Sequence, residues 1–147
     1  MTKSSGKILV VESRFYNDIA EALWQGAVEI LKADGQTVER VTVPGVFEIP
    51  SAVQFAWQSD RFDGCVTLGC VIRGETDHYD HICREVSRKL MDLVVKHAIP
   101  HGFGILTCEN IEQAWERADR KPINIGARAS KACLQMLKIK MAFNHRE

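Results

Sequence analysis

The sequence predicts an α/β fold in which four parallel strands lie between two layers of helices. Two observations predict it: short apolar runs alternate with longer segments of helical periodicity, and Gly or Pro residues separate them. Strands that alternate with helices pair in parallel, because each helix carries the chain back across the sheet.

The first half of the chain supplies two strand–helix units. Residues 7–11 are largely a continuous apolar run, which is typical of a strand buried on both faces. Residues 18–34 repeat apolar side chains at helical spacing and stop before Gly35. Residues 37–43 alternate as a half-buried strand does, and residues 50–60 form a second helix that begins at a proline.

The second half repeats the pattern with longer elements. Residues 64–72 are the most strongly buried strand candidate, and a long amphipathic helix follows over residues 77–97. Residues 104–107 form the fourth strand, before two helices at 109–118 and 126–141. This order predicts a flavodoxin-like three-layer αβα sandwich with a four-stranded parallel sheet.

Length and composition indicate one globular domain over residues 1–147, of which we expect residues 1–6 to be disordered. Lys plus Arg and Asp plus Glu both number 19, so we expect neither nucleic acid nor a membrane surface as a partner. No run is long enough to cross a bilayer. The five cysteines lack CxxC spacing and favour buried thiols in a reducing cytoplasm.

Parallel sheets bind ligands beyond the carboxyl ends of their strands, so the loops there carry the candidate chemistry. In loop 73–78 a glycine allows a tight turn that aims the N–H groups of Glu75 and Thr76 at an anion, as in a phosphate cradle. His78 follows within reach for proton transfer. The alternative is that Thr76 or Asp77 caps an ordinary helix and that His78 is a surface residue.

Two further loops offer contacts for a planar heterocycle. Loop 43–50 is stiffened by two prolines, and Glu48 could accept hydrogen bonds from hydroxyl groups. Alternatively it is a rigid connection whose Phe47 and Ile49 pack into the core. Phe15, just past the first strand, either stacks on an aromatic ligand or covers the core.

Taken together, these segments resemble the lumazine synthases of riboflavin biosynthesis, from about residue 7 to residue 136. The resemblance is carried, in order and with matching spacing, by Phe15, VPGVFEIP (43–50), LGCVIRGETDH (68–78) and GFGILTCENIEQAWERA (102–118). It implies a single lumazine synthase domain and a transferase that condenses 5-amino-6-(D-ribitylamino)uracil with 3,4-dihydroxy-2-butanone 4-phosphate. The product is 6,7-dimethyl-8-ribityllumazine. No redox step is involved, so the resemblance implies no cofactor and no metal.

The resemblance also implies a role for individual residues. His78 transfers protons, and Phe103 and Arg117 reach the site from an adjacent subunit. The ribitylaminouracil is bound by Phe15, Val46, Phe47, Glu48, Cys70, Val71, Ile72 and Phe103. The sugar phosphate is bound by Glu75, Thr76 and Arg117.

The sequence departs from the family pattern before the last helix. Ile125 stands where the family usually has a lysine, and Arg128 where an acidic residue is common, which predicts a weaker or rearranged sugar-phosphate site. Residues 119–123 include a proline and replace the glycine-containing kink of members that build sixty-subunit shells. We therefore expect a homo-oligomer that is a pentamer, with the active site at the subunit interface.

Two other functions fit the same fold. One is an oligomer that binds flavin or another heterocycle without catalysis, and the other is a structural scaffold descended from an enzyme. Neither requires His78 or Arg117, so turnover separates them from a synthase. Trp24, Trp57 and Trp115 are either interface anchors or parts of the core.

Overall fold

The structure, a computed structural model, describes residues 6–74 and 78–144. Its four strands form one parallel sheet in the order β2-β1-β3-β4, which confirms the predicted sheet. The strands are β1 (Lys7–Ser13), β2 (Thr37–Val43), β3 (Gly64–Ile72) and β4 (His101–Cys108).

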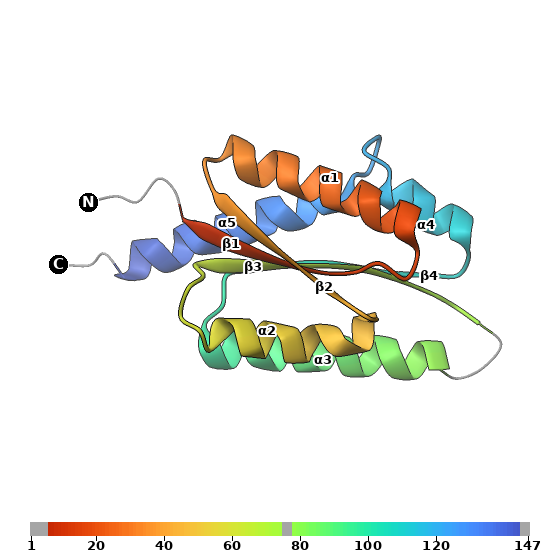
Figure 1. The fold of residues 1–147 in the computed structure, drawn as a ribbon, viewed down its shortest axis with the longest axis horizontal. Helices are drawn as coiled ribbons and strands as arrows, with labels where there is room; N and C mark the ends of the chain where they lie inside the picture. Colours follow the sequence, from red (N-terminus) through yellow and green to blue (C-terminus); the bar gives the residue numbers. More distant parts are fainter. Residues whose placement is uncertain (1–5, 75–77, 145–147) are drawn as a thin grey trace.

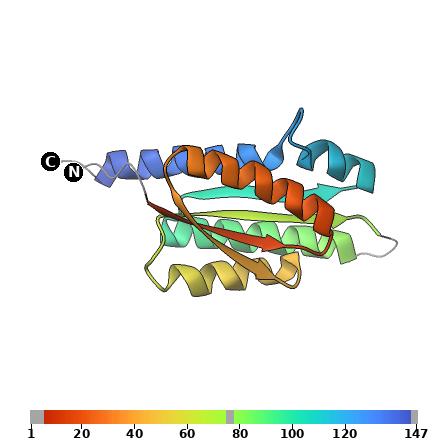
Figure 2. The ribbon, with the colours of Figure 1, turned by 45° about the horizontal axis from the view of Figure 1, so that its top comes forward.

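In the part of the chain that the structure describes, five α-helices cover the two faces of this sheet. They complete the three layers (Figure 1 and Figure 2). One face carries α1 (Asn17–Ala33), α4 (Ile111–Ala118) and α5 (Ile125–Asn144). The other carries α2 (Ile49–Trp57) and α3 (His78–His97). Among the described residues, no helix is both long and apolar enough to cross a membrane.

The alternation of β1 divides the core between the two faces. Ile8 and Val10 pack against α1 and α5, whereas Leu9 and Val11 pack towards α2 and α3. All four side chains are fully buried. Since a strand in the middle of the sheet is covered on both faces, residues 8–11 of β1 are all apolar, which is why the sequence pattern located it.

The ends of the helices differ from the predicted positions by up to three residues, and local contacts explain two of them. Gly35 ends α1 with a φ of 84° and donates its N–H to the Lys32 carbonyl oxygen. The α4 helix begins at residue 111 rather than 109, because the Asn110 side chain accepts from the backbone N–H of Gln113.

The N-terminal segment and the start of α3 bear on two further expectations. Residues 1–5 and Asp77 lie outside the described residues. Gly6, which the sequence predicted to be disordered, is placed instead: its N–H donates to Gln36 Oε1, and its carbonyl oxygen accepts from Thr37. Only residues 1–5 of the predicted disordered segment therefore remain an expectation.

Candidate active site

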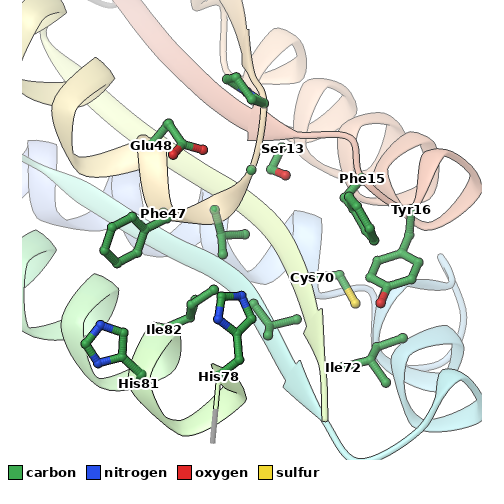
Figure 3. Close-up of a pocket in the computed structure, with 14 residues that line it drawn as sticks. Ser13, Phe15, Tyr16, Phe47, Glu48, Cys70, Ile72, His78, His81 and Ile82 are labelled. Carbon is green, nitrogen blue, oxygen red and sulfur yellow. The ribbon is translucent and has the colours of Figure 1, made fainter. Parts of the chain in front are cut away.

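A cavity of about 640 Å³ opens at the carboxyl ends of the central strands (Figure 3). The last residue of β1 and the two aromatic residues of the following loop form one wall, and the 44–48 loop after β2 forms another. The end of β3 and the first turn of α3 complete it. A cavity of this size lies within the range of pockets that hold drug-sized molecules.

The cavity brings together eight of the twelve residues named from the sequence. They are Phe15, Val46, Phe47, Glu48, Cys70, Val71, Ile72 and His78. Glu75 and Thr76 lie outside the described residues, so the phosphate cradle stays a prediction. Phe103 and Arg117 are not among the residues that line the cavity.

Two aromatic side chains border the cavity and are available for stacking. The Phe15 side chain is 74% exposed, and its ring lies edge-on to that of Tyr16, with the ring centroids 5.0 Å apart. Phe47 is half exposed, and its ring centroid lies 6.2 Å from that of His81. An exposed aromatic ring beside a cavity gains apolar burial when a planar ligand covers it.

The 44–48 loop both closes the core and lines the cavity. Val46–Glu48 forms one turn of 3-10 helix, and Val46 and the following Ile49 are buried. Phe47 and Glu48 are instead exposed and line the cavity. Of the two side chains that the core alternative named, Ile49 lies in the core, whereas Phe47 lies beside the cavity.

Several groups at the cavity could donate, accept or move protons. His78 is the first residue of α3 and is exposed, and His81 lies one turn further along the same helix. Burial raises the pKa of the Tyr16 phenol. Burial also raises the pKa of the Cys70 thiol to about 12, so this sulfur is protonated at neutral pH and is a poor nucleophile. The cavity lining still holds His78, His81 and the Glu48 carboxylate, all of which can exchange protons.

The described lining contains a carboxylate but no lysine or arginine. Arg14, the nearest cation in sequence, is held by Glu12 at 3.0 Å and Glu21 at 2.8 Å. Arg73, at the end of β3, is 2.9 Å from Glu109 and 3.3 Å from Asp80. Both guanidinium groups are therefore already paired with carboxylates, and neither arginine lines the cavity.

Comparisons with known proteins identify the family that this chain resembles. Residues 5–141 match the profile of the 6,7-dimethyl-8-ribityllumazine synthase family. The chain is 47% identical over 142 residues to 6,7-dimethyl-8-ribityllumazine synthase 1 of Rhodopseudomonas palustris, with 93% of this chain and 87% of the relative covered. It is 48% identical over 138 residues to the protein of the same name from Rhizobium meliloti, with 90% of each chain covered.

A third relative, the 6,7-dimethyl-8-ribityllumazine synthase of Bartonella tribocorum, is 47% identical over 137 residues, with 92% of this chain and 91% of the relative covered. The chain belongs to the 6,7-dimethyl-8-ribityllumazine synthase family. The family resemblance is confirmed, and so is the αβα fold predicted from the order of strands and helices.

Two of the residues that the lumazine synthase resemblance assigned lie apart from the cavity. Phe103 is on the edge strand β4 and is 45% exposed. The Arg117 guanidinium lies on α4, donating to the Gln113 carbonyl oxygen at 3.2 Å and contacting Cys108 Sγ at 3.9 Å. Their predicted role in this lumazine synthase thus requires a second chain.

Six residues that line the cavity were given no role by the resemblance to lumazine synthases. Ser13, Tyr16 and Pro44 line the cavity, as do Gly45, His81 and Ile82. His81 follows His78 by three residues, so helical spacing already placed both on one face of α3. Ser13 gave no comparable signal, because a serine at the end of a strand is usual in any turn.

The structure also places the other residues that the sequence analysis singled out. Ile125 begins α5, is half-buried and packs against the core between the sheet and α1. Trp24 and Trp57 pack against the core, whereas Trp115 is 38% exposed. All five cysteines are free thiols, and the described residues contain no cluster of three metal-ligating side chains.

Proposed function

We propose that this chain condenses 5-amino-6-(D-ribitylamino)uracil with 3,4-dihydroxy-2-butanone 4-phosphate to 6,7-dimethyl-8-ribityllumazine, a transferase step of riboflavin biosynthesis. Family membership supports the reaction. One observation supports placing this reaction in the cavity: exposed aromatic side chains, the buried end of β3, a carboxylate and His78 all line it.

We assign the heterocyclic substrate to the part of the cavity bounded by Phe15, the end of β3 and the 46–48 turn. Phe15 stacks on the pyrimidine, and the backbone groups of Cys70–Ile72 pair with its edge. Val46 and Phe47 cover the ribityl chain, while Glu48 accepts hydrogen bonds from its hydroxyl groups. The lining offers apolar surface and few polar groups, as expected of a site that orients an uncharged planar ligand.

The sugar phosphate then lies at the start of α3, where Glu75 and Thr76 hold its phosphate together with Arg117 of a neighbouring subunit. A helix N-terminus favours an anion through its free N–H groups and its dipole. The absence of a lining cation among the described residues supports an arginine from a second chain. Arginine suits this task, because its planar guanidinium makes paired, charge-assisted bonds to phosphate oxygens.

The chemistry follows from this placement. The substrate amine attacks the ketone and water leaves, giving an imine; phosphate then leaves and the resulting enol tautomerises. The ribitylamino nitrogen closes the ring onto the carbonyl with loss of a second water. Holding two reactants in register lowers the barrier by up to roughly 10 kcal/mol. His78 moves the protons and contributes roughly 10²- to 10⁴-fold.

We further propose a pentamer in a reducing cytoplasm. Large apolar side chains that the single chain leaves exposed support an interface; they include Phe55, Val95 and Phe143, exposed by about 70% each. Free thiols on all five cysteines support a reducing compartment. A pentamer gives each cavity a neighbouring chain, and light scattering that reports a megadalton particle would contradict it.

Turnover tests the proposed reaction. The purified protein, mixed with both substrates, should yield the absorbance and fluorescence of the lumazine. His78→Ala should lower kcat by about 10²-fold or more, whereas His97→Ala, at the far end of the same helix, should not. Binding of a flavin or of ribitylaminouracil without product would instead establish the non-catalytic alternative.

A further inference from the structure

Ser13 carries a buried hydroxyl without a partner at the floor of the cavity. The residue ends β1 and is 3% exposed, and its Oγ has no hydrogen-bond partner among the described residues. Native proteins pair nearly all buried polar side chains, and a hydroxyl left alone there lowers stability. An unpaired hydroxyl that borders a cavity therefore indicates a partner supplied by whatever fills the cavity.

The position of Ser13 follows from the alternation of β1. Leu9 and Val11 point to the α2 and α3 side, so Ser13 continues the same face, where the core ends and the cavity begins. Its packing is close: a Cβ added to Gly69 would lie 3.7 Å from Ser13 Cβ and 2.7 Å from Val46 Cγ1. Figure 3 shows the hydroxyl directed into the cavity, between Glu48 and Phe15.

Part of the cavity lining offers no partner for a polar group. Val46, Val71 and Ile82, which also line the cavity, are aliphatic. A serine hydroxyl can both donate and accept, so it can pair with a carbonyl, an amine or a hydroxyl of a ligand. A site that buries one such group rejects analogues that leave it unpaired.

We propose that Ser13 Oγ hydrogen-bonds the ribitylaminouracil substrate and is a specificity-determining residue of the proposed synthase reaction, on which this inference rests. Its partner lies where the polyol chain joins the pyrimidine, because Ser13 sits between the aromatic ring assigned to the pyrimidine and the carboxylate assigned to the polyol. The hydroxyl takes part in binding and not in proton transfer.

The chain contains a matched control in Ser130. This α5 residue is also fully buried, and its hydroxyl also lacks a partner among the described residues, but it does not line the cavity. Removing either hydroxyl takes away an unpaired buried polar atom, so neither alanine variant should be less stable. Only the Ser13 variant should bind substrate more weakly.

The test measures KM for each substrate, kcat, and the unfolding midpoint for the unaltered protein, Ser13→Ala, Ser13→Cys and Ser130→Ala. Ser13→Ala should raise KM for the ribitylaminouracil roughly fivefold to tenfold, the loss expected for one hydrogen bond. Its kcat, its KM for the sugar phosphate and its midpoint should change little. Ser13→Cys replaces the hydroxyl with a slightly larger thiol that is a weaker donor, and should shift the same KM less.

The outcomes separate this inference from the proposed reaction. No lumazine from the unaltered protein would reject the reaction, and with it this inference. Turnover by the unaltered protein, together with an unchanged KM in Ser13→Ala, would reject the Ser13 contact alone, since an ordered water would then satisfy the hydroxyl. Equal rises in KM for both substrates, or an equal rise in Ser130→Ala, would also overturn it.

Discussion

At the scale of single residues, the four consecutive side chains of residues 12–15 differ in their burial and in their hydrogen-bond partners. Glu12 is buried on the α1 side and fully paired, whereas Ser13 is buried on the cavity side and unpaired. Arg14 is tied to Glu12 and Glu21, and Phe15 is left exposed at the cavity. The alternation of β1 therefore directs Glu12 to the α1 face of the sheet and Ser13 to the face that borders the cavity.

The protonation of His101 gives a prediction for stability in acid. Burial lowers the pKa of this imidazole from 6.5 to about 4 in the folded protein, where its Nε2 lies 3.0 Å from Thr67 Oγ1. Between these two values the unfolded chain binds a proton that the folded chain does not, so stability falls as the pH drops. From pH 7 to pH 5, this group should cost about 1–2 kcal/mol.

Urea unfolding at fixed protein concentration checks this expectation. His101→Gln should lose less stability between pH 7 and pH 5 than the unaltered protein, while His97→Gln, an exposed histidine of α3, should behave like the unaltered protein. An identical pH dependence in His101→Gln and the unaltered protein would contradict the assignment to His101.

Ile125 gives a prediction for substrate binding. Its side chain packs against the core at the start of α5, and a lysine there could keep that contact with its methylene stem while its ammonium group reaches water. If the missing charge weakens the sugar-phosphate site, Ile125→Lys should lower KM for that substrate roughly threefold to tenfold. Ile125→Met, an uncharged control, should not. An unchanged KM in the lysine variant would count against the hypothesis.

At the scale of whole elements, the sequence located buried elements well and polar contacts poorly. The limits of β3 agree with the predicted 64–72, because this central strand is apolar apart from Thr67. The predicted 104–107 strand is longer, β4 spanning His101–Cys108. Glycine is disfavoured inside strands, so Gly102 gave no sign of belonging to one. A Cβ at this position would lie 1.8 Å from the Ala129 carbonyl oxygen, so the glycine allows α5 to approach the sheet.

The contacts of Glu12 show why the rest could not be predicted. Its carboxylate accepts from Arg40 Nε at 2.7 Å and Thr42 Oγ1 at 2.8 Å. Both partners lie on β2, about thirty residues away in sequence, and meet Glu12 only through the parallel register that pairs it with Thr42. Local periodicity carries no information on such a pairing, and for the same reason it did not distinguish Ser13.

This cluster predicts a large effect on stability from one buried carboxylate. Glu12 is 1% exposed and joins β1 to β2, and through Arg14 to α1. Glu12→Gln loses charge-assisted bonds to two guanidinium groups and should lower the free energy of unfolding by about 1–3 kcal/mol. Urea unfolding measures the change.

The matched control is Glu39→Gln. Glu39 pairs with Arg61 and Lys7 at the protein surface, where water replaces a lost partner, so its midpoint should change little. Equal shifts of the midpoint in the two variants would show that burial of the Glu12 cluster contributes nothing.

At the scale of the whole molecule, the folded chain leaves its cavity chemically incomplete. The described lining supplies no cation for a phosphate, and two residues that the family resemblance assigns to the site, Phe103 and Arg117, lie away from it. Large apolar side chains remain exposed on several helices. The proposed pentamer accounts for these features together, since each cavity in it borders a neighbouring chain.

A shared site predicts that two inactive chains restore activity to each other. His78→Ala lacks the proton-transfer group, and Arg117→Ala lacks the phosphate contact, so each assembly alone should be nearly inactive. When both variants are expressed together and mix at random, a cavity is intact if its own chain keeps His78 and its neighbour keeps Arg117. Each condition holds at half of the positions, so about a quarter of the unaltered activity should return. As a control, activity should not return when the two assemblies are mixed without exchanging subunits. If activity is also absent after co-assembly has been confirmed, His78 and Arg117 act within one chain, which contradicts the shared site.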